Sequence, residues 1–220
     1  MNTNTKVALG FTGAVILIIL AFIVTVIVQA QSRPAPVPDP VTGLPPTVRE
    51  DSRRLNDPDS AAVTFVEFLE FECEACGAAF PYVEDLRTEY GDRVTFVVRY
   101  FPLPSHFNSK NAAIAVEAAA EQGQLEAMYV RMFEMQSEWG EKQESQAETF
   151  RLYAYQLGLN MDDFDAAVAD PKTLERVMSD LQDGRALGVD STPTMFVNDV
   201  KIELTSFDDI RAALEEALGE

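Results

Sequence analysis

Residues 61–76 read AAVTFVEFLEFECEAC, and this stretch decides how the chain folds. Its first part is almost wholly apolar on both alternating faces up to Glu70, which is the pattern of a strand buried on both sides. Helical spacing follows from Cys76 to Tyr90, and Gly91 is a natural end for that helix. A second buried strand is expected from Val94 to Phe101. This order of elements predicts a parallel strand–helix–strand crossover.

A long helical block separates this unit from two further strands. Apolar spacing and capping residues predict helices at 108–122, 124–139, 145–158, a short one from 160, and 171–188. The remaining expected elements are strands at 194–197 and 201–204 and a final helix at 206–218. The prediction is an α/β domain, in which one half supplies a parallel pair of strands and the other an antiparallel hairpin.

The charge balance narrows the range of partners. The chain has 36 Asp and Glu side chains against 17 Lys and Arg, and its formal net charge is −19. Such a surface repels phosphate groups, so we expect no nucleic-acid partner. The excess acid either keeps the domain soluble or steers basic partners towards it.

Cys73-Glu74-Ala75-Cys76 lies where the first strand ends and the helix begins. The reactive form of cysteine is the thiolate, and a helix N-terminus stabilises anions. Cys73 is therefore the candidate nucleophile, and Cys76, one turn further on, can resolve a mixed disulfide. A bridge between them closes almost no loop, so stability is a poor reason for the pair. A zinc site would need four ligands, and the chain offers one further Cys or His, His106, so we expect no metal.

The N-terminal region reads as a membrane anchor. Residues 7–28 carry no charge, and as a helix they would span roughly 33 Å, close to the thickness of a bilayer core. Lys6 and the terminal amine precede this run, so we expect residues 1–6 in the cytoplasm and the rest of this single-pass protein outside. The alternative is a cleaved signal peptide with a site near Ala30, although its apolar core would be unusually long.

Residues 29–57 are rich in proline and predict an extended linker to a domain that covers residues 58–220. A second arrangement is left open, in which residues 44–55 pack onto the domain as an arm. We expect the domain without residues 1–57 to fold as a soluble monomer, because its core elements begin near Ala61.

Two motifs together resemble the bacterial DsbA family of the thioredoxin superfamily. Residues 67–86 are similar to its active-site segment, and residues 188–198, GVDSTPTMFVN, are similar to its second signature. The helical block, about residues 106–188, matches the insertion of that family. The resemblance covers about residues 60–218. It implies a thioredoxin-like fold with a helical insertion and redox chemistry that needs no cofactor.

The resemblance also implies roles for three residues outside the cysteine pair. Thr192-Pro193 would hold a cis peptide bond against the cysteines, and the Thr192 backbone would bind an extended substrate. The other interpretation of Pro193 is a proline at the start of a strand. Glu67 lies in an apolar strand, where a charge is costly, so a raised pKa and a proton-shuttling role are expected. Otherwise it is an edge-exposed side chain without a role.

Glu74 and Ala75 depart from the best-known DsbA, which has Pro-His between its cysteines. A histidine there helps to hold the thiolate, whereas Glu74 would repel it. The sequence therefore predicts that Glu74 and Ala75 tune this protein towards a weaker oxidant. His106 is expected to be a structural loop residue.

These features favour a disulfide oxidase of exported cysteine-containing proteins, reoxidised by a quinone-linked membrane partner that the tether keeps close. One alternative is a reductase or isomerase on the same fold. The other is a non-enzymatic, membrane-anchored, chaperone-like binding module, for which both cysteines would be dispensable.

Overall fold

The computed structural model describes residues 44–220. The expected cytoplasmic residues 1–6, the membrane segment 7–28 and the linker up to residue 43 lie outside this part and stay predictions. Between Leu44 and Glu220, no helix is both long enough and apolar enough to cross a membrane.

The described chain contains the predicted strands and helices in the predicted order, with one short strand and one short helix that the sequence did not predict. The strands are β1 (Arg53–Arg54), β2 (Val63–Leu69), β3 (Val94–Tyr100), β4 (Thr194–Val197) and β5 (Val200–Lys201). The helices are α2 (Glu74–Tyr90), α3 (Ser109–Glu121), α4 (Leu125–Glu134), α5 (Gln136–Trp139), α6 (Ala147–Gln156), α7 (Met161–Ala169), α8 (Pro171–Ala186) and α9 (Asp208–Leu218).

Within residues 44–220, the strands form one five-stranded sheet in the order β1-β3-β2-β4-β5. The central strand, β2, pairs in parallel with β3 along its whole length and antiparallel with β4. β4 then pairs antiparallel with β5. The parallel crossover, the antiparallel hairpin and the α/β class are thereby confirmed.

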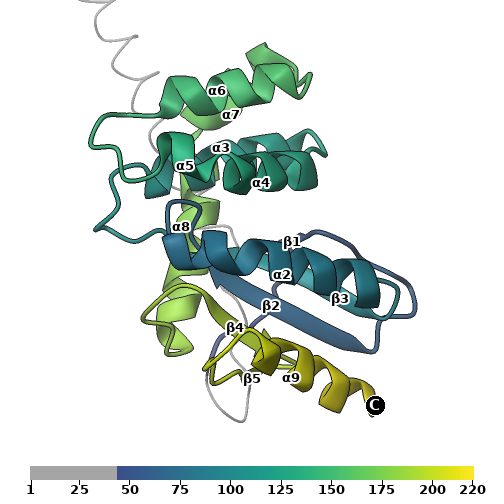
Figure 1. The fold of residues 1–220 in the computed structure, drawn as a ribbon. Helices are drawn as coiled ribbons and strands as arrows, with labels where there is room; N and C mark the ends of the chain where they lie inside the picture. The colour runs from purple at the N-terminus through teal and green to yellow at the C-terminus, as the bar shows by residue number, and fades with distance from the viewer. Residues whose placement is uncertain (1–43) are drawn as a thin grey trace, which may run out of the picture. The chain divides into compact units, whose positions relative to one another are not determined.

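Helices cover both faces of the sheet (Figure 1). α2 and α9 pack on the face that carries Val63 and Phe65, and α8 packs on the face that carries Val66 and Phe68. Side chains alternate between the two faces along a strand. Glu67 therefore shares the face of Phe65 and points to the side of the sheet that α2 covers.

The helices α3, α4, α6 and α7 form a separate layer (Figure 1). Their apolar side chains pack in one cluster with Leu69, Phe71, Tyr100 and both cysteines. The layer therefore rests on the carboxyl ends of β2 and β3 and on the start of α2. Trp139 is fully buried there, with its ring 4.8 Å from that of Phe150 in an edge-on arrangement.

Two predicted elements differ in length from the observed ones. The single helix expected at 124–139 is two helices, because the backbone at Met135 leaves helical geometry between α4 and α5. The strand expected at 201–204 ends at Lys201. Shortly after it, the Asp209 carboxylate accepts hydrogen bonds from the backbone N–H groups of Thr205 and Ser206, which turns the chain into α9.

Residues 44–55 pack onto the domain as an arm, which was the second of the two arrangements that the sequence allowed. β1 pairs antiparallel with β3 and covers what would otherwise be an edge of the sheet. Arg99, fully buried in β3, donates to the Thr47 carbonyl at 2.5 Å, and also to Asp180 at 2.5 Å and Asp183 at 2.6 Å on α8. The arm thus completes the hydrogen bonding of a buried guanidinium.

Removing the arm should destabilise the domain. A chain that begins at residue 58 lacks Thr47 and β1. Buried Arg99 then loses one hydrogen-bond acceptor, and the backbone groups at the edge of β3 lose their partner strand. We expect its free energy of unfolding to be lower by roughly 3 kcal/mol than that of a chain that begins at residue 44. Urea unfolding of the two chains measures this difference. Equal stabilities would show that the arm only rests on the domain.

Candidate redox site

Cys73 is the residue that precedes the first turn of α2. Its backbone is extended, with φ −71° and ψ 120°, and its carbonyl accepts the first helical hydrogen bond, from Gly77 N at 3.0 Å. The helix therefore begins at Glu74, two residues earlier than the apolar spacing predicts. This shift puts the Cys73 sulfur at the helix N-terminus, where unpaired N–H groups favour an anion.

The two thiols have opposite acidities. Both cysteines are free; the side chain of Cys76 is fully buried, whereas Cys73 is 8% exposed. The pKa of Cys73 is lowered to about 5, chiefly by a hydrogen bond from the Cys76 thiol; burial opposes this, and hydrogen bonds from Thr192 and the backbone of α2 add to it. Burial raises the pKa of Cys76 well above its usual range, and the hydrogen bond to Cys73 raises it further.

The Thr192-Pro193 segment lies directly against Cys73. Its peptide bond is cis, as the resemblance implies. The Cys73 thiol donates to the Thr192 carbonyl at 3.4 Å. The Thr192 hydroxyl is buried without another hydrogen-bond partner among the described residues, and it helps to lower the pKa of Cys73. The structure thus brings the two sequence motifs together, while the role of Thr192 in substrate binding stays a prediction.

Glu67 is buried in the middle of the sheet, with 3% of its surface exposed, and pairs with Val98 and Met195 on the neighbouring strands. It is therefore not an edge-exposed side chain. Burial raises its pKa to about 8, and the negative charges of Cys73 and Glu84 add to the effect. Glu67 in turn contributes to the raised pKa of Cys76. The raised pKa agrees with the expectation, and the proton-shuttling role stays a prediction.

Glu74 and Ala75 are both exposed at the start of α2. The Glu74 carboxylate therefore lies in solvent, where water and salt weaken its repulsion of Cys73. Its tuning effect stays a prediction, and the exposure makes a small effect the expected one.

Gln136 is a site residue that the sequence did not suggest. Its Nε2 donates to the carbonyl oxygens of Phe71 at 2.7 Å and Cys73 at 2.9 Å. A Cβ atom added at Gly77 would lie 2.1 Å from Gln136 Oε1, so a larger residue there would displace Gln136 from its present position. The one signal in the sequence is a glycine inside a helix, which marks a close approach but does not identify the neighbour.

An acidic cluster with a histidine flanks the cysteines, and the sequence did not predict the contact between these side chains. Glu70 and Glu72 follow β2 and are each 2% exposed, so both side chains are buried. His106 Nδ1 lies 2.8 Å from both carboxylate oxygens of Glu70. Glu72 Oε2 accepts from Asn108 N at 2.7 Å, whereas its Oε1 is buried without a partner among residues 44–220.

The arrangement has the chemistry of thiol–disulfide exchange. An acidic thiol at a helix N-terminus can attack a disulfide, and a buried thiol one turn away can resolve the mixed disulfide. Within the described part of the chain, no group of three or more His, Cys, Asp and Glu side chains has an arrangement that could hold a metal ion.

Comparison with solved structures gives the same architecture. A thioredoxin-like oxidoreductase from Silicibacter pomeroyi DSS-3 is 23% identical, with a TM-score of 0.66 over 78% of this chain and 95% of that one. Alpha-DsbA1 from Wolbachia pipientis is 19% identical, with a TM-score of 0.66 over 78% and 93%. BdbD from Bacillus subtilis is 22% identical, with a TM-score of 0.64 over 77% and 94%. At these identities the similarity establishes the fold, which is thioredoxin-like with a helical insertion.

Curated relatives match only in part. The chain is 38% identical over 168 residues to the Na(+)/H(+) antiporter NhaA 1 of Mycobacterium sp. (strain KMS), which is 73% of this chain and 26% of that protein. The Na(+)/H(+) antiporter NhaA of Herminiimonas arsenicoxydans is 36% identical over 158 residues, 70% of this chain and 24% of that protein. The chain thus spans about a quarter of the length of these relatives.

The family assignment follows from the match to a protein-family model. A family model described as thioredoxin matches residues 57–216, which include the cysteine pair, the helical layer and the Thr192-Pro193 segment. With the fold and the geometry at Cys73, this match identifies the chain as a member of the thioredoxin family.

Proposed function

We propose that the chain is a thiol–disulfide oxidase that acts on exported, cysteine-containing proteins through Cys73 and Cys76. The observation that carries the proposal is the difference in acidity between the two thiols. A pKa of about 5 keeps Cys73 ionised at neutral pH. An oxidant of this class is strong because its reduced, thiolate form is stabilised. The low pKa therefore favours an oxidase over a reductase on the same fold.

The proposed reaction is a balanced exchange of one disulfide for another. A substrate thiolate attacks Cys73 of the Cys73–Cys76 disulfide, and Cys76 leaves with the electron pair of the broken bond. A second substrate thiolate then attacks the substrate sulfur of the mixed disulfide, so that Cys73 leaves as a thiolate. The substrate is oxidised by two electrons and the cysteine pair is reduced.

Glu67 is the proposed proton donor in the first step. The leaving Cys76 is buried and has a raised pKa, so it takes up a proton. Glu67 has a pKa of about 8, and so it holds a proton at neutral pH and can give it to a stronger base. Thr192 is the proposed substrate-binding residue, because its carbonyl lies against the reactive sulfur.

The place of action and the redox partner are part of the proposal. The apolar run at residues 7–28 supports a single-pass anchor with the domain outside the cytoplasm. Similarity to segments of proteins named Na(+)/H(+) antiporters supports a membrane setting. The reduced cysteine pair would pass its two electrons to a quinone-linked membrane protein.

Trapping experiments test the roles of the two cysteines. Cys76→Ser should accumulate mixed disulfides with reduced, unfolded substrate proteins after activation of Cys73, because no thiol remains to resolve them. Cys73→Ser should accumulate none, since Cys76 is fully buried. Non-reducing gels with each variant show the adducts. Adducts on Cys73→Ser alone would reverse the assignment.

The pH dependence of Cys73 follows from its lowered pKa. The rate of alkylation of the reduced protein by iodoacetamide should rise with a midpoint near pH 5, not near the ordinary value of about 8.5. By linkage, the stability that the thiolate adds is fully present above about pH 8.5 and is lost as the pH falls through 5. The reduced protein should therefore lose stability relative to Cys73→Ser over that range. An alkylation midpoint above pH 7 would contradict both expectations.

The reduction potential separates the oxidase from a reductase and tests Glu74. Glu74→His removes a negative charge beside Cys73, so the potential should rise by roughly 30 mV or less, because one pKa unit corresponds to about 30 mV in a two-electron couple. Glu216→His, an exposed site on α9, is the matched control and should leave the potential unchanged. Equilibration with glutathione measures all three proteins. A wild-type potential as low as that of thioredoxin, about −270 mV, would favour the reductase.

A further inference from the structure

The surroundings of Cys73 are acidic, which poses an electrostatic problem for a thiolate. Glu70 and Glu72 are buried in the turn before Cys73, Glu67 is buried in the strand before them, and Glu74 follows. Within residues 44–220, no Lys or Arg side chain forms an ion pair with any of these four carboxyl groups. Burial keeps Glu67 protonated at neutral pH, and solvent weakens the repulsion from Glu74. Glu70 and Glu72 are therefore the carboxyl groups that most oppose a negative sulfur. A positive charge close to the sulfur would offset them.

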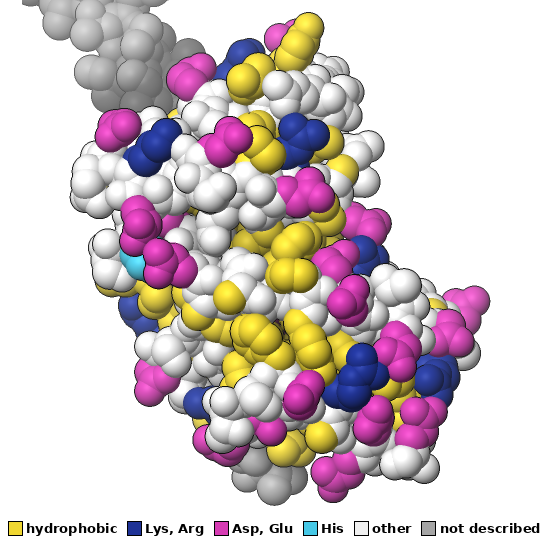
Figure 2. Space-filling model, in the orientation of Figure 1, with side chains coloured by type: hydrophobic (Ala, Val, Ile, Leu, Met, Phe, Trp, Pro, Cys, Tyr) yellow, Lys and Arg dark blue, Asp and Glu magenta, His cyan; other side chains and the backbone are white. Residues whose placement is uncertain are grey.

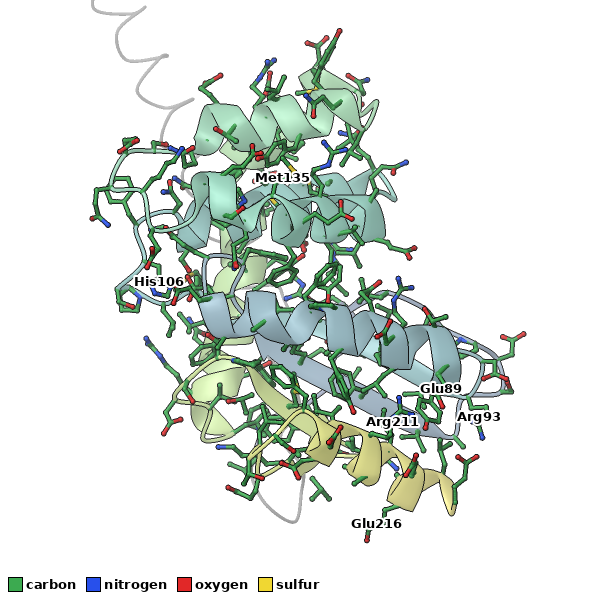
Figure 3. All side chains as sticks on the ribbon, viewed as in Figure 1. Glu89, Arg93, His106, Met135, Arg211 and Glu216 are labelled. Atoms are coloured by element: carbon green, nitrogen blue, oxygen red, sulfur yellow. The ribbon has the colours of Figure 1, made fainter. Side chains whose placement is uncertain are left out.

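His106 is the side chain that can supply that charge. It belongs to the loop between β3 and α3, and Figure 3 shows it beside the N-terminal end of α2. Its Nδ1 lies 2.8 Å from both Oε1 and Oε2 of Glu70, whose backbone carbonyl accepts from Cys73 N at 3.2 Å. Glu70 thus contacts the imidazole through its side chain and Cys73 through its backbone carbonyl.

The loop holds His106 in this position. The backbone N–H of Asn108 donates to the Glu72 carboxylate at 2.7 Å, and the backbone N–H of Leu103 donates to the Ser109 hydroxyl at 3.0 Å. The Glu70 side chain is 1% exposed, whereas that of His106 is 33% exposed. The histidine therefore has a fixed inner partner and an outer edge open to solvent protons.

We infer that the imidazolium of His106, held by Glu70, is the positive charge that stabilises the Cys73 thiolate. The two residues between the cysteines, Glu74 and Ala75, carry no positive charge, so His106 supplies it from a different loop. His106 is a positioning residue in this inference, because it acts on the reaction through the charge of Cys73. The inference rests on the proposed redox function and extends it by naming a group that sets the potential.

The pKa shifts of His106 and Glu70 agree with a positive imidazole beside a carboxylate. Burial works to lower the pKa of His106, but the hydrogen bond and charge of Glu70 raise it overall, with further contributions from Glu72 and Cys73. Burial raises the pKa of Glu70 to about 7, against hydrogen bonds from Ser109 and His106. Because the pKa of His106 is raised, its charge is present below that pKa and disappears as the pH rises through it.

The effect of the imidazolium on the thiolate must be reciprocal, because the two protonation equilibria are linked. If the imidazolium stabilises the thiolate, the thiolate must stabilise the imidazolium by the same free energy. The thiolate exists only in the reduced protein, because both sulfurs are neutral in the disulfide. The pKa of His106 should therefore be higher in the reduced protein than in the oxidised one.

The first experiment follows the imidazole directly by NMR. His106 is the one histidine in the sequence, so in the full chain without a histidine tag its ring protons give a single titrating set of signals. We expect a higher pKa in the reduced than in the oxidised full-length protein, and no such difference in Cys73→Ser treated with the same reductant. Equal values in the two redox states would overturn the inference, and this measurement needs no His106 variant.

The second experiment measures the effect on the cysteine. His106→Gln keeps a hydrogen-bond donor for Glu70 but cannot become positive. It should raise the pKa of Cys73 and shift the glutathione equilibrium of the full chain about tenfold towards the oxidised protein, since one pKa unit is a factor of ten. The shift should shrink to nothing as the pH rises through the pKa of His106. Lys172→Gln removes one exposed positive charge from α8 and should change neither quantity.

The outcomes separate this inference from the proposed function. A shift in His106→Gln that is the same at every pH would indicate a purely structural role and overturn the inference, as would an equal shift in Lys172→Gln. Both readouts follow the cysteines and the imidazole without a protein substrate. A wild-type chain that never forms the Cys73–Cys76 disulfide would instead overturn the proposed function.

Discussion

The position of Cys73, between the end of a buried strand and the start of a helix, is the constraint on which the rest of the site depends. The strand must be buried to fix the direction from which the chain enters α2, and the helix must begin at Glu74 for its free N–H groups to face the sulfur. The same geometry places Cys76 one turn along, fully buried. The pKa values of two identical side chains thereby shift in opposite directions, because Cys73 receives hydrogen bonds from the Cys76 thiol and from the backbone of α2, whereas Cys76 is fully buried.

The short helix α5 adds hydrogen bonds to this junction. Gln136 donates to the carbonyls of Phe71 and Cys73. The Phe71 carbonyl lies before the helix, and the Cys73 carbonyl accepts the first hydrogen bond of the helix. Gly77 has no side chain, which leaves room for Gln136. The break between α4 and α5 immediately precedes this glutamine. The interruption of the predicted long helix thus coincides with a contact to the redox site. Gln136 thus satisfies two backbone carbonyls of the turn, whereas Glu72 Oε1 stays buried without a partner among residues 44–220.

The carboxylates of the domain have different surroundings at the surface, in the core and at the redox site. Figure 2 shows Asp and Glu side chains spread over the visible face, where water and salt screen them. Beneath the surface, Arg99 is held by Asp180 and Asp183 in a buried cluster that joins β3 to α8. At the redox site the partner of Glu70 is His106, whose charge depends on pH. A fixed guanidinium suits a structural role, whereas a titratable imidazole suits a site that gains and loses charge with each redox cycle.

The sequence by itself determined the α/β class, the order of most elements and the junction at Cys73-Cys76, because these depend on local apolar patterns and on a short motif. The contact of that junction with Thr192-Pro193 was implied by the resemblance to the DsbA family. Only the tertiary structure decided which groups gather around the sulfur. Gln136 and His106 lie far along the chain from Cys73, and their spacing carries no local signal. The arm from residue 44 is likewise explained by buried Arg99, whose need for partners appears only when the strands are assembled. Hydrogen bonds and charges act through space, whereas a sequence pattern records only what is close along the chain.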